Sequence, residues 1–325
     1  MTLEFVSQAS KGGVGLRGLS VVGEEIAWAS GTGGSFARTA DGGASWSWGA
    51  IRGYESLDFR SIKAFDDRNA VVASAGAPAT ILLTDDGGAS WREAFRDATG
   101  RMFLDAMAFR DRRSGLALGD PLDDGRCVLR TRDSGASWSR VPPEDLPDAV
   151  EGESHFAASG TCLAAFGDSG LCFVGGGSVA RAYWSDDDGA SWRASDLPLI
   201  RGKPSRGAFS VAALDGARAC VVGGDYASPE LCRDTAAYTE DGGRSWKASA
   251  AFPPGGYNSC VAYLPGTGGR VVIATGTQGS HLSEDGGMTW ASVDPAPFNV
   301  IAFAESGGRG WAAGTDGRIC AVVAR

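Results

Sequence analysis

The residues with the clearest chemical potential in this sequence are arginines and aspartates that lie beside short apolar runs. The six that stand out are Arg17, Arg60, Arg206, Asp105, Asp120 and Asp225. A guanidinium group fits a planar carboxylate through paired hydrogen bonds, so converging arginines favour an anionic ligand. Two carboxylates on either side of a bound sugar can instead hydrolyse a glycosidic bond. The elements that position these side chains decide between the two chemistries.

The sequence contains no recognisable motif for binding a cofactor or a metal ion. Residues 120–125, Asp-Pro-Leu-Asp-Asp-Gly, are rich in oxygen ligands but lack the spacing of a calcium loop, so we interpret them as a solvated turn. The seven cysteines form no Cys-x-x-Cys pair, and only two histidines are present, so we expect no metal. No strand–glycine-loop–helix unit surrounds residues 31–34, so we expect no dinucleotide cofactor. Most cysteines should be small buried side chains, with a disulfide between Cys162 and Cys172 as the less favoured alternative.

An octet of the form Ser/Thr-x-Asp-x-Gly-x-x-Trp occurs six times and contains six of the ten tryptophans. Its carboxylate and hydroxyl groups can accept backbone N–H groups within the loop, its glycines permit positive φ, and its tryptophan closes the turn as an apolar plug. We therefore predict that the octets are structural hairpin turns. Their aspartates are Asp41, Asp86, Asp133, Asp187, Asp241 and Asp285.

The octet aspartates are 45, 47, 54, 54 and 44 residues apart, and short runs of β-branched and aliphatic residues precede each octet. Four short strands in a period of this length are typical of a propeller blade. Residues 298–323 provide three strands of a seventh blade, and residues 3–7 are expected to supply its outer strand and close the ring. The prediction is an all-β fold in which residues 1–325 form a single seven-bladed β-propeller of four-stranded antiparallel blades.

In such a blade, the turn between the first two strands lies on the same side of the ring as the octet, which we name the octet face. The other connections lie on the opposite side, the candidate face, where we predict a site for a peptide or anionic ligand. The alternatives are a merely polar, solvated mouth, or arginines neutralised by the nearby aspartates. The candidate residues on this face are Arg17, Arg60, Asp105, Asp120, His155, Arg181, Arg206, Asp225, Tyr226, Asn258 and Asn299. His281 is expected in a loop on the same face.

The octet resembles the Asp-box, or bacterial neuraminidase repeat. Through segments such as residues 16–20, 156–160 and 223–226, nearly the whole chain resembles the bacterial relatives of photosystem II assembly-factor propellers. This resemblance implies a binding or assembly scaffold. A carbohydrate-active glycoside hydrolase is the alternative, because sialidases and endoglucanases also contain Asp-boxes. A sialidase should carry a Phe-Arg-Ile-Pro-like motif before its first octet, whereas residues 59–62 follow the first octet and lack the proline. Tyr226 with Glu230, or Tyr257, would be its candidate nucleophiles by location.

The overall charge and the ends of the chain limit the expected partners. A net charge of −9 argues against binding to nucleic acid, and no apolar run is long enough to span a membrane. The first residues do not resemble a signal peptide, so we expect export only if a leader has been removed, and a cytoplasmic location otherwise. The expected partner of a monomeric propeller is a peptide, a protein or a small anionic or carbohydrate ligand.

Overall fold

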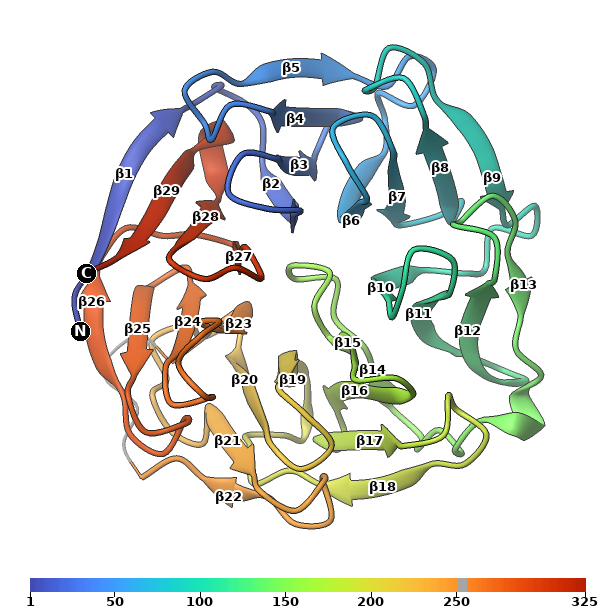
Figure 1. Cartoon of the computed structure of the whole chain (residues 1–325). Helices are drawn as coiled ribbons and strands as arrows, with labels where there is room; N and C mark the ends of the chain where they lie inside the picture. Colours follow the sequence, from blue (N-terminus) through green and yellow to red (C-terminus); the bar gives the residue numbers. More distant parts are fainter. Residues whose placement is uncertain (251–255) are drawn as a thin grey trace.

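The computed structural model describes residues 1–250 and 256–325, and its strands form a closed ring (Figure 1). Five sheets contain four strands each, and a sixth contains nine. The nine-stranded sheet joins a five-stranded unit to a four-stranded unit, because Gly176 in the first pairs with Gly207 in the second. Counted separately, these two units and the other five sheets make seven blades within the described residues. Each blade is an antiparallel meander, as the short apolar runs predict.

Blades 1 to 3 follow one another along the chain. Blade 1 contains β2 (Leu16–Val21), β3 (Ala27–Gly31), β4 (Ser35–Thr39) and β5 (Ser47–Ala50). Blade 2 contains β6 (Asp58–Ala64), β7 (Ala70–Ala75), β8 (Thr80–Thr84) and β9 (Arg92–Arg96). Blade 3 contains β10 (Leu104–Phe109), β11 (Gly115–Leu122), β12 (Gly125–Thr131) and β13 (Ser139–Arg140).

Blade 4 differs from the others because its first strand is interrupted. Two short strands, β14 (Glu153–Ser154) and β15 (Leu163–Phe166), both pair with β16 (Gly170–Gly177), and β17 (Arg181–Ser185) and β18 (Arg193–Asp196) complete the blade. Blade 5 contains β19 (Lys203–Ala213), β20 (Ala219–Asp225), β21 (Ala236–Thr239) and β22 (Lys247–Ala248). Short 3-10 helices span Pro143–Asp145 and Thr315–Gly317.

The ring closes between the two ends of the chain. Blade 6 contains β23 (Cys260–Tyr263), β24 (Val272–Gly276), β25 (Gly279–Ser283) and β26 (Ala291–Asp294), and blade 7 begins with β27 (Val300–Phe303), β28 (Arg309–Ala313) and β29 (Ile319–Ala324). The outer strand of blade 7 is β1 (Leu3–Ala9), which pairs antiparallel with β29 from Leu3 opposite Ala324 to Ala9 opposite Ile319. The predicted closure by the N-terminal strand is confirmed.

All six octets lie between the third and fourth strands of their blades and form the predicted hydrogen bonds. In the first octet, Thr39 Oγ1 accepts the N–H of Gly43 at 2.9 Å, and Asp41 Oδ1 accepts the N–H of Ser45 at 2.9 Å. The other five octets repeat both bonds. The octets are therefore self-contained turns. Their tryptophans are only partly buried, apart from Trp290.

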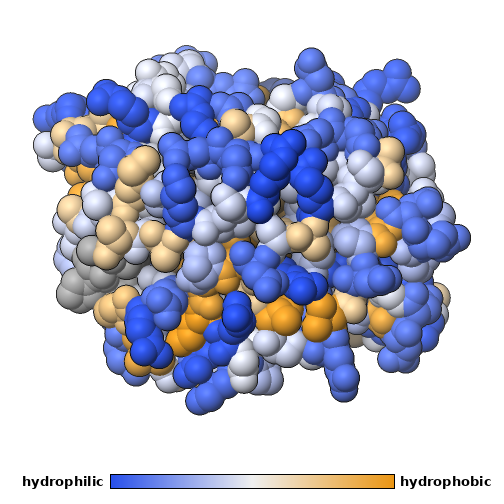
Figure 2. All heavy atoms as spheres, turned by 90° about the horizontal axis from the view of Figure 1, so that it is seen from below, coloured by the Kyte–Doolittle hydropathy of each residue, from blue (hydrophilic) through white to orange (hydrophobic). Residues whose placement is uncertain are grey.

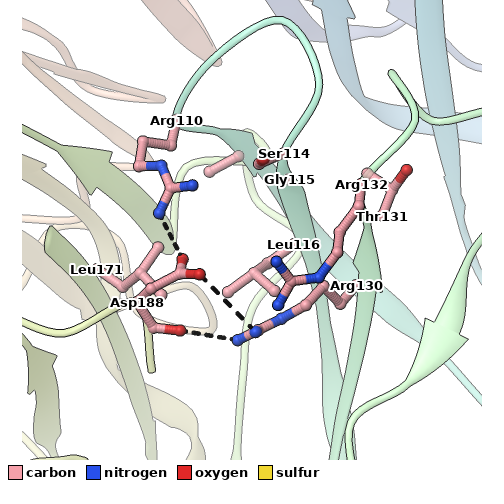
Figure 3. A pocket seen from close by; sticks show the side chains of 10 residues that line it. Arg110, Ser114, Gly115, Leu116, Arg130, Thr131, Arg132, Leu171 and Asp188 are labelled. Carbon is pink, nitrogen blue, oxygen red and sulfur yellow. Dashed lines mark hydrogen bonds and ion pairs between the residues drawn. The ribbon is translucent and has the colours of Figure 1, made fainter. Parts of the chain in front are cut away.

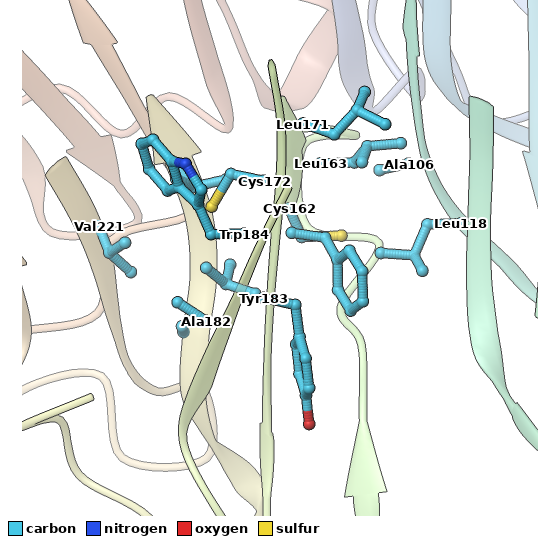
Figure 4. Packing of buried hydrophobic residues seen from close by; sticks show 14 of the residues in the cluster. Ala106, Leu118, Cys162, Leu163, Leu171, Cys172, Ala182, Tyr183, Trp184 and Val221 are labelled. Atoms are coloured by element: carbon cyan, nitrogen blue, oxygen red, sulfur yellow. The ribbon is translucent and has the colours of Figure 1, made fainter. Parts of the chain in front are cut away.

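The core lies in the layers between neighbouring blades. Figure 4 shows the cluster around blade 4, in which side chains of blades 3, 4 and 5, including Leu118, Trp184 and Val221, pack together. Cys162 and Cys172 lie in this cluster as free thiols, so the alternative of a disulfide between them is wrong. Six of the seven cysteines are buried, as expected.

The outer wall of the ring is mainly hydrophilic in the side view of Figure 2, with hydrophobic side chains gathered in its lower half. Within residues 1–250 and 256–325, no helix has the length and apolar character that a bilayer span requires.

Candidate functional site

The inner strands of four blades carry a β-bulge at a matching position. In blades 1 and 2 the bulged residues are Arg17 and Arg60, and in blade 3 the bulged residue is Asp105. In blade 5 it is Phe209, three residues after Arg206, so Arg206 does not occupy the position that Arg17 and Arg60 hold in their blades. A bulge changes the direction of a side chain relative to the regular strand, so these four residues share an orientation that simple alternation does not give.

Residues 155–162, which we name the central segment, connect β14 to β15 and extend into the middle of the ring (Figure 1). Ser159 Oγ donates a hydrogen bond to the carbonyl of Ser259 in blade 6 at 2.6 Å, and Thr161 Oγ1 lies 2.7 Å from Ser210 Oγ in blade 5. The central segment also packs closely against blade 2, because a Cβ atom on Gly160 would lie 2.6 Å from the carbonyl oxygen of Arg60. The central segment thus contacts opposite sides of the ring and crosses its axis.

The two bulged arginines converge on the central segment. Arg17 Nη1 donates to the carbonyl of Ala158 at 2.9 Å, and Arg60 Nη1 donates to the carbonyl of Ala157 at 3.2 Å. Burial lowers the pKa of Arg17, and the charge of Arg60 lowers it further. Arg60 also forms a 2.7 Å ion pair with Asp58, while a third of its side chain remains exposed. Arg17 and Arg60 therefore approach one another at the central segment without Arg206, and the groups they bind are backbone carbonyls of the chain itself.

The three candidate aspartates differ in environment. Asp105 is only 1% exposed, and burial raises its pKa well above the usual range, with the charge of Asp120 as a second cause. Asp120 accepts the backbone N–H of His155 at 2.8 Å, and burial raises its pKa also. Asp225 forms a 2.8 Å ion pair with Arg206. Burial raises the pKa of Asp225, but hydrogen bonds from Arg206, Ser205 and the N–H of Ala227, together with the charge of Arg206, lower it overall. Internal neutralisation, the alternative considered above, is thus observed for Arg206.

His155 is buried and belongs to the interior of blade 4. Its Nε2 lies 3.1 Å from Nη1 of Arg126, and its Nδ1 lies 2.9 Å from the carbonyl oxygen of Val174. Because Arg126 can only donate, Nε2 accepts and Nδ1 carries the proton. Burial and the charge of Arg126 lower the pKa of His155 to about 4, so the ring is neutral at physiological pH.

Arg126 is the centre of a buried polar network that sequence reasoning missed. Its Nη2 forms a 2.9 Å ion pair with Glu153, and both side chains are fully buried. Tyr183 donates its hydroxyl to Glu153 at 2.8 Å, and the guanidinium group lies 3.9 Å from the centre of the Tyr183 ring. This network fixes the chain where it enters the central segment. A buried charge needs such partners, but no motif in the sequence indicates the pairing of residues 27 positions apart.

Four aromatic side chains lie beside the arginines, and we name them the aromatic cluster. Its members are Phe156, Phe209, Tyr226 and Tyr257. Phe156 stacks on Phe209 with ring centres 4.1 Å apart, and Tyr257 meets Phe209 edge-on at 5.0 Å. Tyr226 contacts both phenylalanines edge-on and is 53% exposed. Tyr257 also packs in one cluster with Ala158, whose carbonyl accepts the hydrogen bond from Arg17. Burial raises the pKa of Tyr257, whereas the charges of Arg17 and Arg60 lower it. Phe156 and Phe209 were missed because an aromatic residue in an apolar run looks like a core residue.

The remaining candidates serve the framework. Asn299 Nδ2 donates to the carbonyl of Leu16 at 2.8 Å and joins blade 7 to blade 1, and Asn258 Nδ2 donates to the carbonyl of Gly256 at 3.2 Å. Arg181 forms a 2.9 Å ion pair with Asp196 on the outer strand of its blade. His281 is buried within β25 rather than in a loop.

The octet face contains a small pocket between blades 3 and 4, shown in Figure 3. Arg110 donates to Asp188 Oδ1 at 2.7 Å, and Arg130 donates to the Asp188 carbonyl at 2.8 Å. These bonds link a turn of blade 3 to the octet of blade 4, so the polar groups of the pocket serve to hold the two blades together. The described part of the chain contains no group of three or more His, Cys, Asp or Glu side chains placed to hold a metal ion.

Comparison with known proteins supports the fold. No protein-family model and no curated protein sequence matches this chain. A solved structure of YCF48 bound to D1 peptide superposes with a TM-score of 0.71 at 16% identity, covering 100% of this chain and 98% of that one. YCF48 from Cyanidioschyzon merolae gives 0.65 at 16% identity, covering 99% and 98%. A GH74 xyloglucanase from Xanthomonas campestris gives 0.64 at 19% identity, covering 98% of this chain and 53% of the enzyme. At these identities the likeness shows a β-propeller fold, which binding proteins and hydrolases share.

Proposed function

We propose that this propeller is a non-catalytic scaffold that binds a peptide carrying a carboxylate group at the centre of the candidate face. The observation that carries the proposal is the placement of Arg17 and Arg60 beside the aromatic cluster. Guanidinium groups bind carboxylates, and an exposed tyrosine supplies apolar contact together with a hydroxyl group. Peptides combine both kinds of group.

The arginines keep hydrogen-bonding capacity for such a ligand. Arg60 uses Nε for Asp58 and Nη1 for the carbonyl of Ala157, which leaves its Nη2 group without a hydrogen bond to the described residues. Arg17 uses Nη1 for the carbonyl of Ala158. Since the central segment holds both side chains in place before binding, little conformational entropy is lost when a ligand arrives.

The glycoside hydrolase alternative has less support. An inverting mechanism needs two carboxyl groups on either side of an open cleft. Asp105 is buried beneath the central segment, where the amide group of Ala157 lies close enough to affect its pKa, and Asp225 is bound to Arg206. Among the three aspartates, only Asp120 is partly exposed. The YCF48 structure bound to D1 peptide shows that a propeller of similar shape can hold a peptide, which supports the binding proposal by analogy.

The test is calorimetric titration with short peptides that end in a free carboxylate next to an aromatic residue. Arg60→Ala should weaken binding by about 1.5–3 kcal/mol, as for other hydrogen bonds to charged groups. C-terminal amidation should have a similar effect. Arg132→Ala is the matched control, because Arg132 is exposed beside the octet Asp133 on the octet face and its loss should leave affinity unchanged. Hydrolysis of a sialoside or polysaccharide by the wild-type protein, or unchanged peptide affinity in Arg60→Ala, would contradict the proposal.

A further inference from the structure

A second cavity lies at the centre of the octet face. Its volume is about 530 Å³, within the range of small-ligand sites. Its walls come from the ends of the inner strands of blades 1, 2, 3 and 4 and from the turn that follows β27 in blade 7. These strands surround the axis of the ring, so the cavity is the mouth of the channel on this face, and none of the residues of the proposed peptide site lines it.

Lys63 on β6 places a positive charge in this cavity. No acidic group among the described residues forms an ion pair with that charge. Its side chain is partly buried, and it has neither a hydrogen bond nor an ion pair within residues 1–250 and 256–325. Burial lowers the pKa of Lys63, and the charge of Glu305 raises it in part. An ammonium group that loses water without gaining a partner is unfavourable, and a bound anion would remove that cost.

The other charged groups at the cavity are already paired, except for Glu305. Arg110 is held by Asp188 at 2.7 Å, and Arg112 is held by Asp66 at 2.9 Å. Glu305 is exposed at the rim. Lys63 is therefore the basic group that remains available to a ligand, and the opposing carboxylate of Glu305 disfavours a ligand with more than one negative charge.

Aromatic side chains form the apolar part of the wall. Phe65 and Phe109 meet edge-on with ring centres 5.1 Å apart, and both are partly exposed where they line the cavity. Phe166 of blade 4 adds a largely buried ring to the same wall. Exposed aromatic surface beside one unpaired ammonium group suits a molecule that has an apolar ring and one acidic group.

We propose that this cavity binds a small aromatic monocarboxylate, with its carboxylate on Lys63 and its ring against Phe65 and Phe109. The site is independent of the peptide site on the candidate face, because the two sites share no residue. A ligand of this kind would be a free metabolite of small-molecule size rather than a protein segment.

The experiment uses phenylacetate, 3-phenylpropionate and indole-3-acetate as probes. Ligand-observed NMR and calorimetry measure the binding of each probe to the protein. The aromatic carboxylates should bind, whereas acetate and the neutral amides of the same compounds should bind at least about tenfold more weakly, a difference of about 1.4 kcal/mol. Lys63→Gln should reduce affinity by at least the same factor. Lys203→Gln is the control, because Lys203 is an exposed lysine on β19, outside the cavity, and its loss should change nothing.

A stability measurement separates the site from a structural role for the lysine. Lys63→Met keeps the length of the side chain and removes the unpaired charge, so its melting temperature should equal or exceed that of the wild type while ligand affinity falls. The proposal is overturned if no aromatic carboxylate binds the folded wild-type protein at millimolar concentration, or if Lys63→Gln and wild type bind the probes equally.

Discussion

Gln8 offers a direct test of how the ring is held closed. It is the extra residue of a bulge in β1, because the register with β29 shifts between Ser7 and Ala9. Its Oε1 accepts the indole N–H of Trp311 at 2.8 Å and that of Trp46 at 3.2 Å, and its Nε2 donates to the carbonyl of Gly42 at 3.3 Å. One side chain thus connects the closing strand to blade 7 and to the octet of blade 1. Gln8→Met keeps a similar volume and removes all three bonds.

The expected cost follows from the burial of the groups left behind. Trp311 is fully buried, and a buried N–H without a partner costs about 1–3 kcal/mol. The bonds to Trp46 and Gly42 are partly buried and longer, so each contributes roughly 0.5–1 kcal/mol. We therefore expect Gln8→Met to lower the free energy of unfolding by about 2–5 kcal/mol. Gln8→Glu, which keeps the acceptor, should cost less.

The assay is urea unfolding, followed by tryptophan fluorescence and circular dichroism, of a double-mutant cycle with Trp311→Phe. Replacing Trp311 by Phe removes the N–H that Gln8 satisfies, so Gln8→Met should be less costly in that background, with a coupling energy of about 1 kcal/mol or more. A cost below about 0.5 kcal/mol for Gln8→Met, or equal costs in both backgrounds, would refute the reasoning that this contact stabilises the closure.

Two further predictions concern the octets and the buried carboxyl group. Asp133→Ala should lower the free energy of unfolding by about 1–3 kcal/mol, because the N–H of Ser137 loses its acceptor. Trp138→Ala should lower it by about 2–4 kcal/mol, because the half-buried ring of Trp138 packs edge-on against Phe109. Urea unfolding tests both, and a loss of peptide affinity in either folded variant would mean that the octets contribute to binding. Asp105→Asn should raise the melting temperature at pH 8 and leave it nearly unchanged near pH 4. Burial raises the pKa of Asp105 in the folded state, so its protonated form contributes stability at low pH that is lost as the pH rises through the folded-state pKa. Equal shifts in melting temperature at the two pH values would contradict this prediction.

The fold could be predicted from the sequence because its defining turns are local. Each octet places its aspartate, hydroxyl and backbone N–H groups within a few residues of one another, so the sequence pattern alone determines the hydrogen bonds. Closure by residues 3–7 was predictable for a related reason. An unpaired strand at the beginning of the chain and an incomplete blade at the end leave two exposed edges, and pairing them removes both.

The candidate site could be predicted only in part, because its geometry depends on contacts between blades. The positions of Arg17 and Arg60 on inner strands were predictable. The bulges that orient them, and the bulge that gives Phe209 rather than Arg206 the matching position in blade 5, are not visible as a pattern of residue types. The interruption of the inner strand of blade 4 is also a tertiary effect. The buried pair of Arg126 and Glu153 lies at the first of the two short strands, and its members are distant in sequence.

Under the proposed function, the central segment lets the same arginines serve stability and binding together. Two guanidinium groups near one axis repel each other, and their partial burial adds a desolvation cost. The carbonyl groups of Ala157 and Ala158 offset part of this cost through hydrogen bonds, but they carry no full charge. Of the two arginines, only Arg60 has a carboxylate within ion-pair distance, so the positive charge at the centre of the candidate face is not fully neutralised within the described residues. A ligand carboxylate would supply the missing charge at a position that the central segment has already fixed. That segment also covers Asp105, so our proposal assigns this site to holding an anionic group rather than to attacking a substrate.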